Sequence, residues 1–236
     1  MKESDLYMLR KGAKSFYEWC KENRKEEYLD LWDYDMNKCS PKDVACTIKD
    51  KYYFKCSMNI HESFLYPIRT ITLENSNGPK CPVCGSIYQW CLDNNRNDII
   101  EAWDYEKNEL DIRMVAKSSS KRAWFTFEYY SYYYPICYIT QKNKNNTDPV
   151  YKYKNSVGYY IVEKYGAIYL TRFWSDKNDK SPFEYDRSSD KYICLKCINK
   201  SYHEEYKIRC YAFTKGDTTG CPMCSSKKVH PLDSFA

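Results

Sequence analysis

Two short stretches decide the fold: KCPVCG at residues 80–85 and GCPMC at residues 220–224. In each stretch two cysteines enclose a proline, which fixes φ and helps to hold a tight turn. A C-x-x-C turn lets two thiolates bind the same metal ion, which is the first interpretation of this spacing where thiols stay reduced. The sequence therefore predicts two metal sites, one at each turn.

Three segments that share a tryptophan indicate an internal repeat. They read YLDLWDYDMN at 28–37, IIEAWDYEKN at 99–108 and YLTRFWSDKN at 169–178. Their tryptophans are 71 residues apart in both intervals: Trp32, Trp103 and Trp174. A fixed period of this kind is typical of a duplicated structural unit.

The middle copy of the repeat has lost its metal-binding turn. Residues 148–151 read DPVY where the other copies read CPVC and CPMC, so the proline remains and both sulfurs are gone. We therefore expect three repeats, of which only the first and third hold a metal. The predicted division is an N-terminal helical cap at 1–27, repeat one at 28–97, the degenerate repeat two at 98–167 and repeat three at 168–236.

The N-terminal segment has the apolar spacing of a helix, whereas the repeats have the composition of strands. Apolar side chains recur near a 3.6-residue period at Leu6, Leu9, Ala13, Phe16, Tyr17 and Cys20. Four segments are dense in the aromatic and β-branched residues that favour strands: 51–56, 63–73, 123–139 and 157–174. The sequence therefore predicts a small, metal-stabilised, β-rich α+β fold.

Zinc is the expected metal because it prefers four tetrahedral ligands from thiolate sulfur and imidazole nitrogen. The first site is predicted to use Cys56, His61, Cys81 and Cys84. The second takes Cys221 and Cys224, while Cys194, Cys197 and His203 compete for its two other positions. The internal repeat favours Cys197 with His203, and ligand spacing favours Cys194 with Cys197. We expect the all-thiolate set and keep His203 as the alternative. Four protein ligands close each shell, so both zinc ions are expected to be structural.

The 13 cysteines among 236 residues are better explained by metal binding than by disulfides. The first 20 residues show no apolar core of a signal peptide, and no run approaches the roughly 18 apolar residues of a membrane helix. We therefore expect an intracellular protein in a reducing compartment, the cytoplasm or nucleus, without a membrane partner. The formal net charge of +5 is a mild excess that favours an acidic partner without requiring one.

The order of motifs resembles a known family. L-x-L-W-D-Y-x-x-N precedes S-P-x-D-V, an aromatic-x-C, a histidine and G-x-x-C-P-x-C. This order resembles the probable zinc-ribbon repeats, treble-clef-like units found in tandem in bacterial, plant and large-DNA-virus proteins. The first copy matches through Leu29, Trp32, Asp33, Asn37, Pro41, Val44, Phe54, Cys56, His61, Cys81 and Cys84. The third matches through Trp174, Asn178, Pro182, Cys197 or Cys194, His203, Cys221 and Cys224. The resemblance implies three tandem zinc-ribbon-like repeats that act as a binding module, in some members beside a nuclease domain.

Enzymatic readings fit the motifs poorly. Zinc deaminases combine H-x-E with P-C-x-x-C, and His203-Glu204-Glu205 followed by residues 221–224 matches this only superficially. The proline lies inside the turn rather than before it, and 18 residues leave little room for the intervening elements of that fold. We expect no catalytic residue and no small-molecule substrate.

Tyrosine and lysine point to nucleic acid. The chain has 26 tyrosines, concentrated in residues 127–138 and 150–165, and at 151–154 tyrosine alternates with lysine. Exposed rings stack on bases and lysines contact phosphates, so a strand here would present tyrosines on one face and lysines on the other. The predicted DNA- or RNA-binding residues are Lys121, Arg122, Tyr151, Lys152, Tyr153 and Lys154. The alternative is a scaffold that binds protein partners through an aromatic surface.

Overall fold

The computed structural model describes residues 12–140, 148–215 and 220–234. These residues form two compact units. The first holds the described residues up to Asn95 together with Leu110–Ser118, and the second holds Arg96–Glu109 and the described residues from Ser119 onward.

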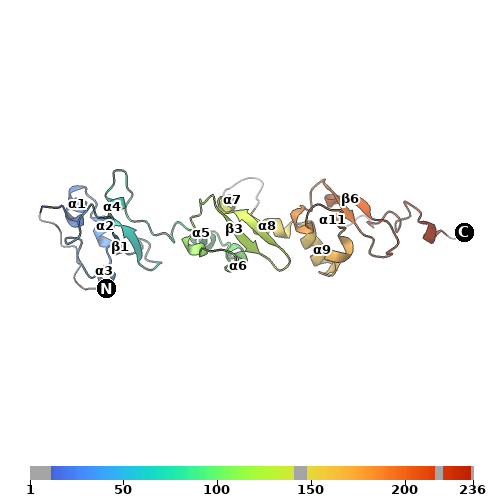
Figure 1. Cartoon of the computed structure of the whole chain (residues 1–236), viewed down its shortest axis with the longest axis horizontal. Coiled ribbons are helices and arrows are strands. Elements are labelled where there is room, and N and C mark those ends of the chain that lie inside the picture. Colours follow the sequence, from blue (N-terminus) through green and yellow to red (C-terminus); the bar gives the residue numbers. More distant parts are fainter. Residues whose placement is uncertain (1–11, 141–147, 216–219, 235–236) are drawn as a thin grey trace. The chain divides into compact units, whose positions relative to one another are not determined.

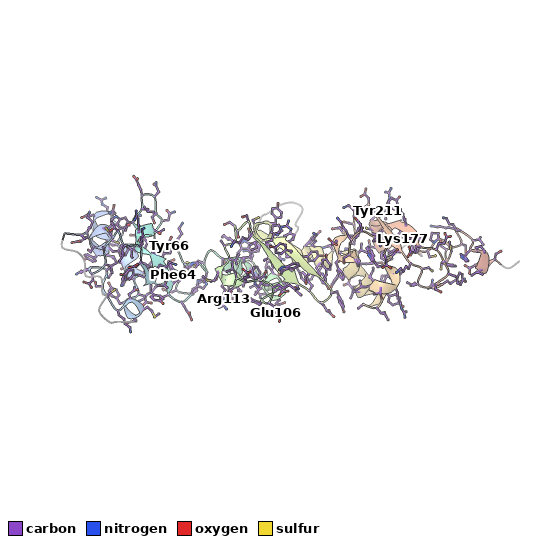
Figure 2. The ribbon with its side chains drawn as sticks, viewed as in Figure 1. Phe64, Tyr66, Glu106, Arg113, Lys177 and Tyr211 are labelled. Atoms are coloured by element: carbon purple, nitrogen blue, oxygen red, sulfur yellow. The ribbon has the colours of Figure 1, made fainter. Side chains whose placement is uncertain are left out.

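The first compact unit contains one two-stranded sheet and several short helices (Figure 1). Strands β1 (Lys51–Phe54) and β2 (Phe64–Pro67) pair antiparallel. On β2, the rings of Phe64 and Tyr66, both labelled in Figure 2, contact edge to face with centroids 6.3 Å apart. The helices are α1 (Phe16–Glu22), α2 (Glu27–Asp30), α3 (Tyr34–Asn37), α4 (Ile68–Ile71), α5 (Ile87–Asp93) and the 3-10 helix η1 (Ile112–Met114).

The second compact unit contains two such sheets. They are the antiparallel pairs β3 (Arg122–Thr126) with β4 (Ser131–Pro135) and β5 (Tyr192–Leu195) with β6 (Tyr206–Arg209). The helices are α6 (Asn97–Ala102), α7 (Ile136–Thr140), α8 (Pro149–Lys154), α9 (Val157–Tyr165), α10 (Tyr169–Phe173), α11 (Cys210–Thr214), η2 (Pro182–Glu184) and η3 (Pro231–Asp233).

The tryptophan motifs hold the three hairpins by the same contacts. Each tryptophan forms an isolated antiparallel bridge with the first strand of its hairpin: Trp32 with Phe54, Trp103 with Phe125 and Trp174 with Leu195. An asparagine a few residues after each tryptophan forms two hydrogen bonds with the strand residue directly before the tryptophan's bridge partner. Its Nδ2 donates to the C=O of that residue, and its Oδ1 accepts the N–H. The pairs are Asn37 with Tyr53, Asn108 with Trp124 and Asn178 with Cys194. These amide clamps satisfy backbone groups that a two-stranded sheet leaves unpaired.

A buried serine begins one helix before each hairpin. The hydroxyl oxygens of Ser15, Ser86 and Ser156 accept a backbone N–H in the first turn of α1, α5 and α9. Such caps supply a partner to an N–H group that the helix itself cannot satisfy. In α1 the side chain of Glu18 also reaches back to the N–H of Ser15, which completes a capping box.

The strand prediction for residues 157–174 is wrong, because α9 and α10 occupy this segment. Val157, Tyr160 and Ile161 are buried at helical spacing after the cap at Ser156, so tertiary burial and capping override the β-propensity of the residues. Strands do form within 51–56, 63–73 and 122–135, but they are short, and the fold is a set of small sheets with helices rather than β-rich. Helix α1 agrees with the predicted N-terminal helix, and Leu6 and Leu9 lie outside the described residues.

Apolar cores surround the hairpins at both ends of the chain. Around β1 and β2 the fully buried side chains of the apolar cluster are Phe16, Cys20, Trp32, Phe54, Ile68 and Ile71. Around β5 and β6 the buried side chains include Val157, Ile161, Phe173, Ile193, Leu195, Cys210 and Phe213.

The three bridging tryptophans differ in their indole hydrogen bonds. Nε1 of Trp32 donates to the carbonyl of Cys39 at 3.0 Å, and Nε1 of Trp174 donates to the carbonyl of Lys180 at 3.2 Å. The buried Nε1 of Trp103 has no partner among the described residues.

This difference predicts unequal costs for the same substitution. Trp32→Phe leaves the Cys39 carbonyl without its donor, whereas Trp103→Phe removes an N–H that has no acceptor. We expect Trp32→Phe to lower the free energy of unfolding by about 1–3 kcal/mol more than Trp103→Phe. Urea unfolding followed by circular dichroism measures both, and equal losses would contradict the assigned role of the indole hydrogen bond.

Candidate metal centres

The first compact unit gathers three thiols and one imidazole at the end of its hairpin. Cys56 follows β1, His61 lies in the turn before β2, and Cys81 and Cys84 come from the turn before α5. Nδ1 of His61 lies 3.5 Å from Sγ of Cys56, 3.5 Å from Sγ of Cys81 and 3.4 Å from Sγ of Cys84. The Sγ atoms of Cys56 and Cys84 are 3.4 Å apart.

The second compact unit builds a second set with the same order of ligands. Its members are Cys197, His203, Cys221 and Cys224. Nδ1 of His203 lies 3.5 Å from Sγ of Cys197, 3.4 Å from Sγ of Cys221 and 3.4 Å from Sγ of Cys224. The Sγ atoms of Cys197 and Cys224 are 3.4 Å apart.

Both donor sets fit zinc. Tetrahedral bonds of about 2.3 Å to sulfur and about 2.0–2.1 Å to nitrogen place sulfurs about 3.8 Å apart and sulfur about 3.6 Å from nitrogen. The observed separations of 3.4–3.5 Å differ from these by a few tenths of an ångström. All four ligand atoms of each set lie within 4.8 Å of one another. Two Cys3His sites therefore fit the two expected zinc ions, and four protein donors fill each tetrahedral shell.

The thiols within each set are electrostatically unequal. Burial opposes ionisation of Cys56, but hydrogen bonds from the N–H of Met58 and from Cys84 prevail and lower the pKa of Cys56 to about 6. Burial, reinforced by the Cys56 sulfur, raises the pKa of Cys84 to about 12. The Cys56 sulfur is thus readily a thiolate, whereas the Cys84 sulfur loses its proton when a metal cation binds in its place. Zinc binding is therefore coupled to proton release.

The expected all-thiolate second site is wrong in one ligand, because His203 takes the position that we assigned to Cys194. Cys194 is fixed in β5 by the Asn178 clamp, and its Sγ lies 3.9 Å from a carboxylate oxygen of Glu205. That carboxylate pairs with Lys177 (Figure 2) at 3.0 Å. A residue held inside the strand does not reach the cluster beyond the strand end, whereas His203 is 5% exposed and lies within it.

The geometry agrees with a comparison to known families. Residues 28–86 match the family model of a probable treble clef zinc finger domain. This segment is similar to that domain. The match contains the first tryptophan motif and all four ligands of the first site. The second Cys3His set lies beyond the treble clef match and repeats its ligand order. No curated protein matches the chain. Among the described residues, no helix has the length and apolar character needed to cross a membrane.

Each ligating histidine is oriented by a group from the element that follows the cysteine turn. Nε2 of His61 donates to Oε1 of Gln89 in α5 at 3.0 Å, and Nε2 of His203 donates to Oδ2 of Asp233 in η3 at 2.5 Å. With the proton on Nε2, the Nδ1 lone pair of each ring faces the sulfurs and is available to the metal.

The two orienting groups differ in charge. Lys200 and the hydroxyl of Tyr202 both donate to Oδ1 of Asp233, and they hold the pKa of this carboxyl well below its usual range. Gln89 is a neutral amide, and its Nε2 donates to Asp93 at 2.8 Å. A carboxylate partner raises the basicity of a ligating imidazole more than an amide does, so the second site is the stronger donor set.

The predicted nucleic-acid face at residues 151–154 is not formed. Asp148 caps α8 by accepting the N–H of Tyr151, and Pro149 occupies the first turn, so this segment is a helix rather than a strand. Tyr151 is exposed and Tyr153 is buried, because residues two apart lie on different faces of a helix. Lys152 and Lys154 are exposed on α8, and Lys121 and Arg122 are exposed at the start of β3.

The middle hairpin carries an aromatic stack where the other two hairpins carry a ligand. Phe127 lies two residues after Phe125, the bridge partner of Trp103. Cys56 and Cys197 likewise lie two residues after the bridge partners of Trp32 and Trp174. Its ring stacks on Tyr153 at 4.4 Å and 9°, and Tyr153 stacks on Phe183 at 5.4 Å and 5°. In the sequence, this stack is indicated by a phenylalanine, Phe127, at the position where the other two hairpins have a cysteine.

An ion pair accompanies the stack. Asp148 is the first residue of the DPVY segment, and its carboxylate is 2% exposed. Nη2 of Arg96 lies 3.1 Å from Oδ1 of Asp148. In the middle hairpin, stacking and ion pairing therefore involve the residue at the position of a cysteine ligand and the first residue of DPVY.

Zinc counting tests the ligand assignment. The purified chain is expected to hold two zinc ions, and Cys84→Ser, Cys224→Ser or His203→Ala to hold one, because each removes a ligand from a single site. Cys194→Ser is the matched control and should retain two. Elemental analysis measures the ratio, and a Cys194→Ser protein with one zinc ion would restore the all-thiolate assignment.

Exchanging the orienting groups tests their role. Gln89→Ala and Asp233→Ala should each weaken zinc affinity at their own site by roughly 10- to 100-fold. Gln89→Glu should strengthen the first site, and Asp233→Asn should weaken the second. Competition with a chromophoric chelator measures both sites. Unchanged affinities in all four variants would contradict the assignment.

Proposed function

We propose that this chain is a non-enzymatic zinc-binding repeat protein that binds nucleic acid. Zinc in the two Cys3His sites has a structural role in this proposal, since four protein donors leave no ligand position for substrate or water. Function is then expected on the surfaces that the metal-stabilised hairpins expose.

The proposal includes three tandem repeats. The recurring tryptophan bridges, asparagine clamps and serine caps support this organisation. The boundaries predicted at residues 28, 98 and 168 remain predictions, and the capping serines favour a repeat that starts about 12 residues earlier, at Ser15, Ser86 and Ser156.

The observation that carries nucleic-acid binding is the pairing of cations with aromatic rings on the hairpins. Nζ of Lys107 lies 5.5 Å from the ring of Trp124, and the Arg122 guanidinium lies 5.9 Å from the ring of Tyr133. On β5 and β6, the Arg209 guanidinium lies 5.2 Å from the ring of Tyr192, which is 59% exposed. Rings that stack on bases beside cations that meet phosphates are typical of single-strand binding surfaces.

Net charge sets the expected strength of this attraction. A site of three thiolates and one neutral imidazole around Zn²⁺ carries a charge of −1, so two such sites lower the formal charge from +5 to +3. The overall attraction to phosphate is therefore modest, and local groups decide where nucleic acid binds.

A scaffold function is the second candidate, and an apolar groove in the first compact unit favours it. The groove has a cavity volume of about 870 Å³ and runs beside the first zinc set. Exposed apolar side chains line it: Ile60, Leu65, Leu92 and Met114. Such a surface is suited to a protein partner.

Salt dependence separates the two candidates. We expect the zinc-loaded chain to bind fluorescent 20-nucleotide oligomers with an affinity that falls as salt rises, by roughly 0.7 log units per log unit of salt for each phosphate contact on a single strand. Fluorescence anisotropy at 25–300 mM salt gives the slope. Failure to retain any single-stranded or duplex probe at low salt would remove nucleic acid and leave the scaffold candidate.

A further inference from the structure

Two aromatic rings stand opposite each other on one side of the β3–β4 hairpin. Trp124 and Tyr133 are paired residues of the antiparallel ladder, and their ring centroids lie 5.0 Å apart at 35°. Tyr133 is 50% exposed and Trp124 is partly exposed. The flanking strand residues Ala123, Phe125, Tyr132 and Tyr134 are buried on the other side. The rings therefore belong to the solvent-facing side of the hairpin rather than to its core.

A cation lies over each ring of this pair. Besides its position over Trp124, Lys107 lies 3.1 Å from Oδ2 of Asp104 and 3.4 Å from Oγ of Ser131. Arg122 extends over Tyr133 and donates to its backbone carbonyl at 3.4 Å. The Asp104 carboxylate is the anion beside the pair, and it is engaged by Lys107, Thr126 and backbone N–H groups. The four groups Lys107, Arg122, Trp124 and Tyr133 are called the platform.

The other two hairpins lack an aromatic pair at these positions. The asparagine clamps mark Tyr53, Trp124 and Cys194 as equivalent, and the ladders place Leu65, Tyr133 and Lys207 opposite them. The first hairpin thus has Tyr53 with Leu65, and the third has Cys194 with Lys207. The platform is specific to the one copy that has no zinc ligands among its described residues.

We infer that the platform binds one or two bases of single-stranded nucleic acid. This inference rests on the proposed function and gives it a site. A base stacks on an aromatic face only when that face of the base is free, which is the case in a single strand and not inside a duplex. Lys107 and Arg122 are placed to meet the flanking phosphates. DNA and RNA share the base faces and phosphates that the platform recognises, and separate probes distinguish them.

Substitution of the two rings tests the inference. Trp124→Ala and Tyr133→Ala should each weaken binding of fluorescent dT20 or U20 by about tenfold or more, without changing the salt slope, because the rings contact no phosphate. Lys107→Gln and Arg122→Gln should each reduce the slope by roughly 0.7. A 20-base-pair duplex should bind more weakly than either single strand.

Leu65→Ala is the matched control, because Leu65 holds the position of Tyr133 in the first hairpin. It should leave the affinity for dT20 and U20 unchanged, because the groove that Leu65 lines belongs to the scaffold candidate and not to the nucleic-acid platform. Every variant should retain two zinc ions and the wild-type melting temperature, and a double variant Trp124→Leu/Tyr133→Leu keeps the side chains apolar if an alanine variant unfolds.

The outcomes separate the inference from the proposed function. Wild-type protein that binds dT20 or U20 while the ring variants bind equally well overturns the platform and leaves nucleic-acid binding in place. Loss of affinity in Leu65→Ala equal to that in Tyr133→Ala also overturns it. Wild-type protein that binds none of the probes overturns the proposed function and the platform together.

Discussion

Coordination by three sulfurs and one imidazole nitrogen is the constraint on which the rest of the structure depends. A two-stranded hairpin of four or five residues per strand is at best marginally stable alone. In the first and third hairpins a Cys3His set lies at the open end of the sheet. It joins the cysteine after the first strand, the histidine of the turn and a C-x-x-C segment that lies 24–28 residues after that first cysteine. A zinc ion there contributes folding free energy that so small a core does not supply.

Each hairpin also donates a hydrogen bond to an element later in the chain, and the acceptor differs each time. In the first, His61 donates to Gln89 of α5. In the third, His203 donates to Asp233 of η3. In the middle hairpin, which has no metal ligands among the described residues, the hydroxyl of Tyr132 donates to the carbonyl of Phe183 in η2 at 2.5 Å. In this hairpin the rings of Phe127, Tyr153 and Phe183 stack on one another, and Phe127 holds the position that a cysteine ligand has in the other two.

Much of the candidate site could be predicted from the sequence, because metal ligands are recognised by residue type and spacing. The C-x-x-C turns and the 71-residue tryptophan period located both clusters, and the internal repeat favoured His203. Spacing alone favoured Cys194, because it carries no information about which residues remain inside a strand. That information lay in Asn178, whose clamp on Cys194 depends on a contact 16 residues away.

The helices were harder to predict than the ligands. Residues 157–174 have the composition of a strand, whereas the cap at Ser156 and the burial of Val157 and Ile161 favour the helix α9 in its first half. In DPVY, the Asp-Pro pair is a helix start signal, with Asp148 as cap and Pro149 in the first turn, and the interpretation of DPVY as a lost cysteine turn leaves this signal out. Because residues 149–154 form a helix, the predicted aromatic face at 151–154 is absent, and the solvent-facing aromatic pair lies on the β3–β4 hairpin instead.

Segment-resolved hydrogen exchange before and after chelation tests the central claim most directly. If coordination holds the first and third hairpins while stacking holds the middle one, chelation should abolish amide protection in residues 51–67 and 192–209 and preserve it in residues 122–135. Uniform retention of protection in all three segments, or uniform loss, would contradict the account.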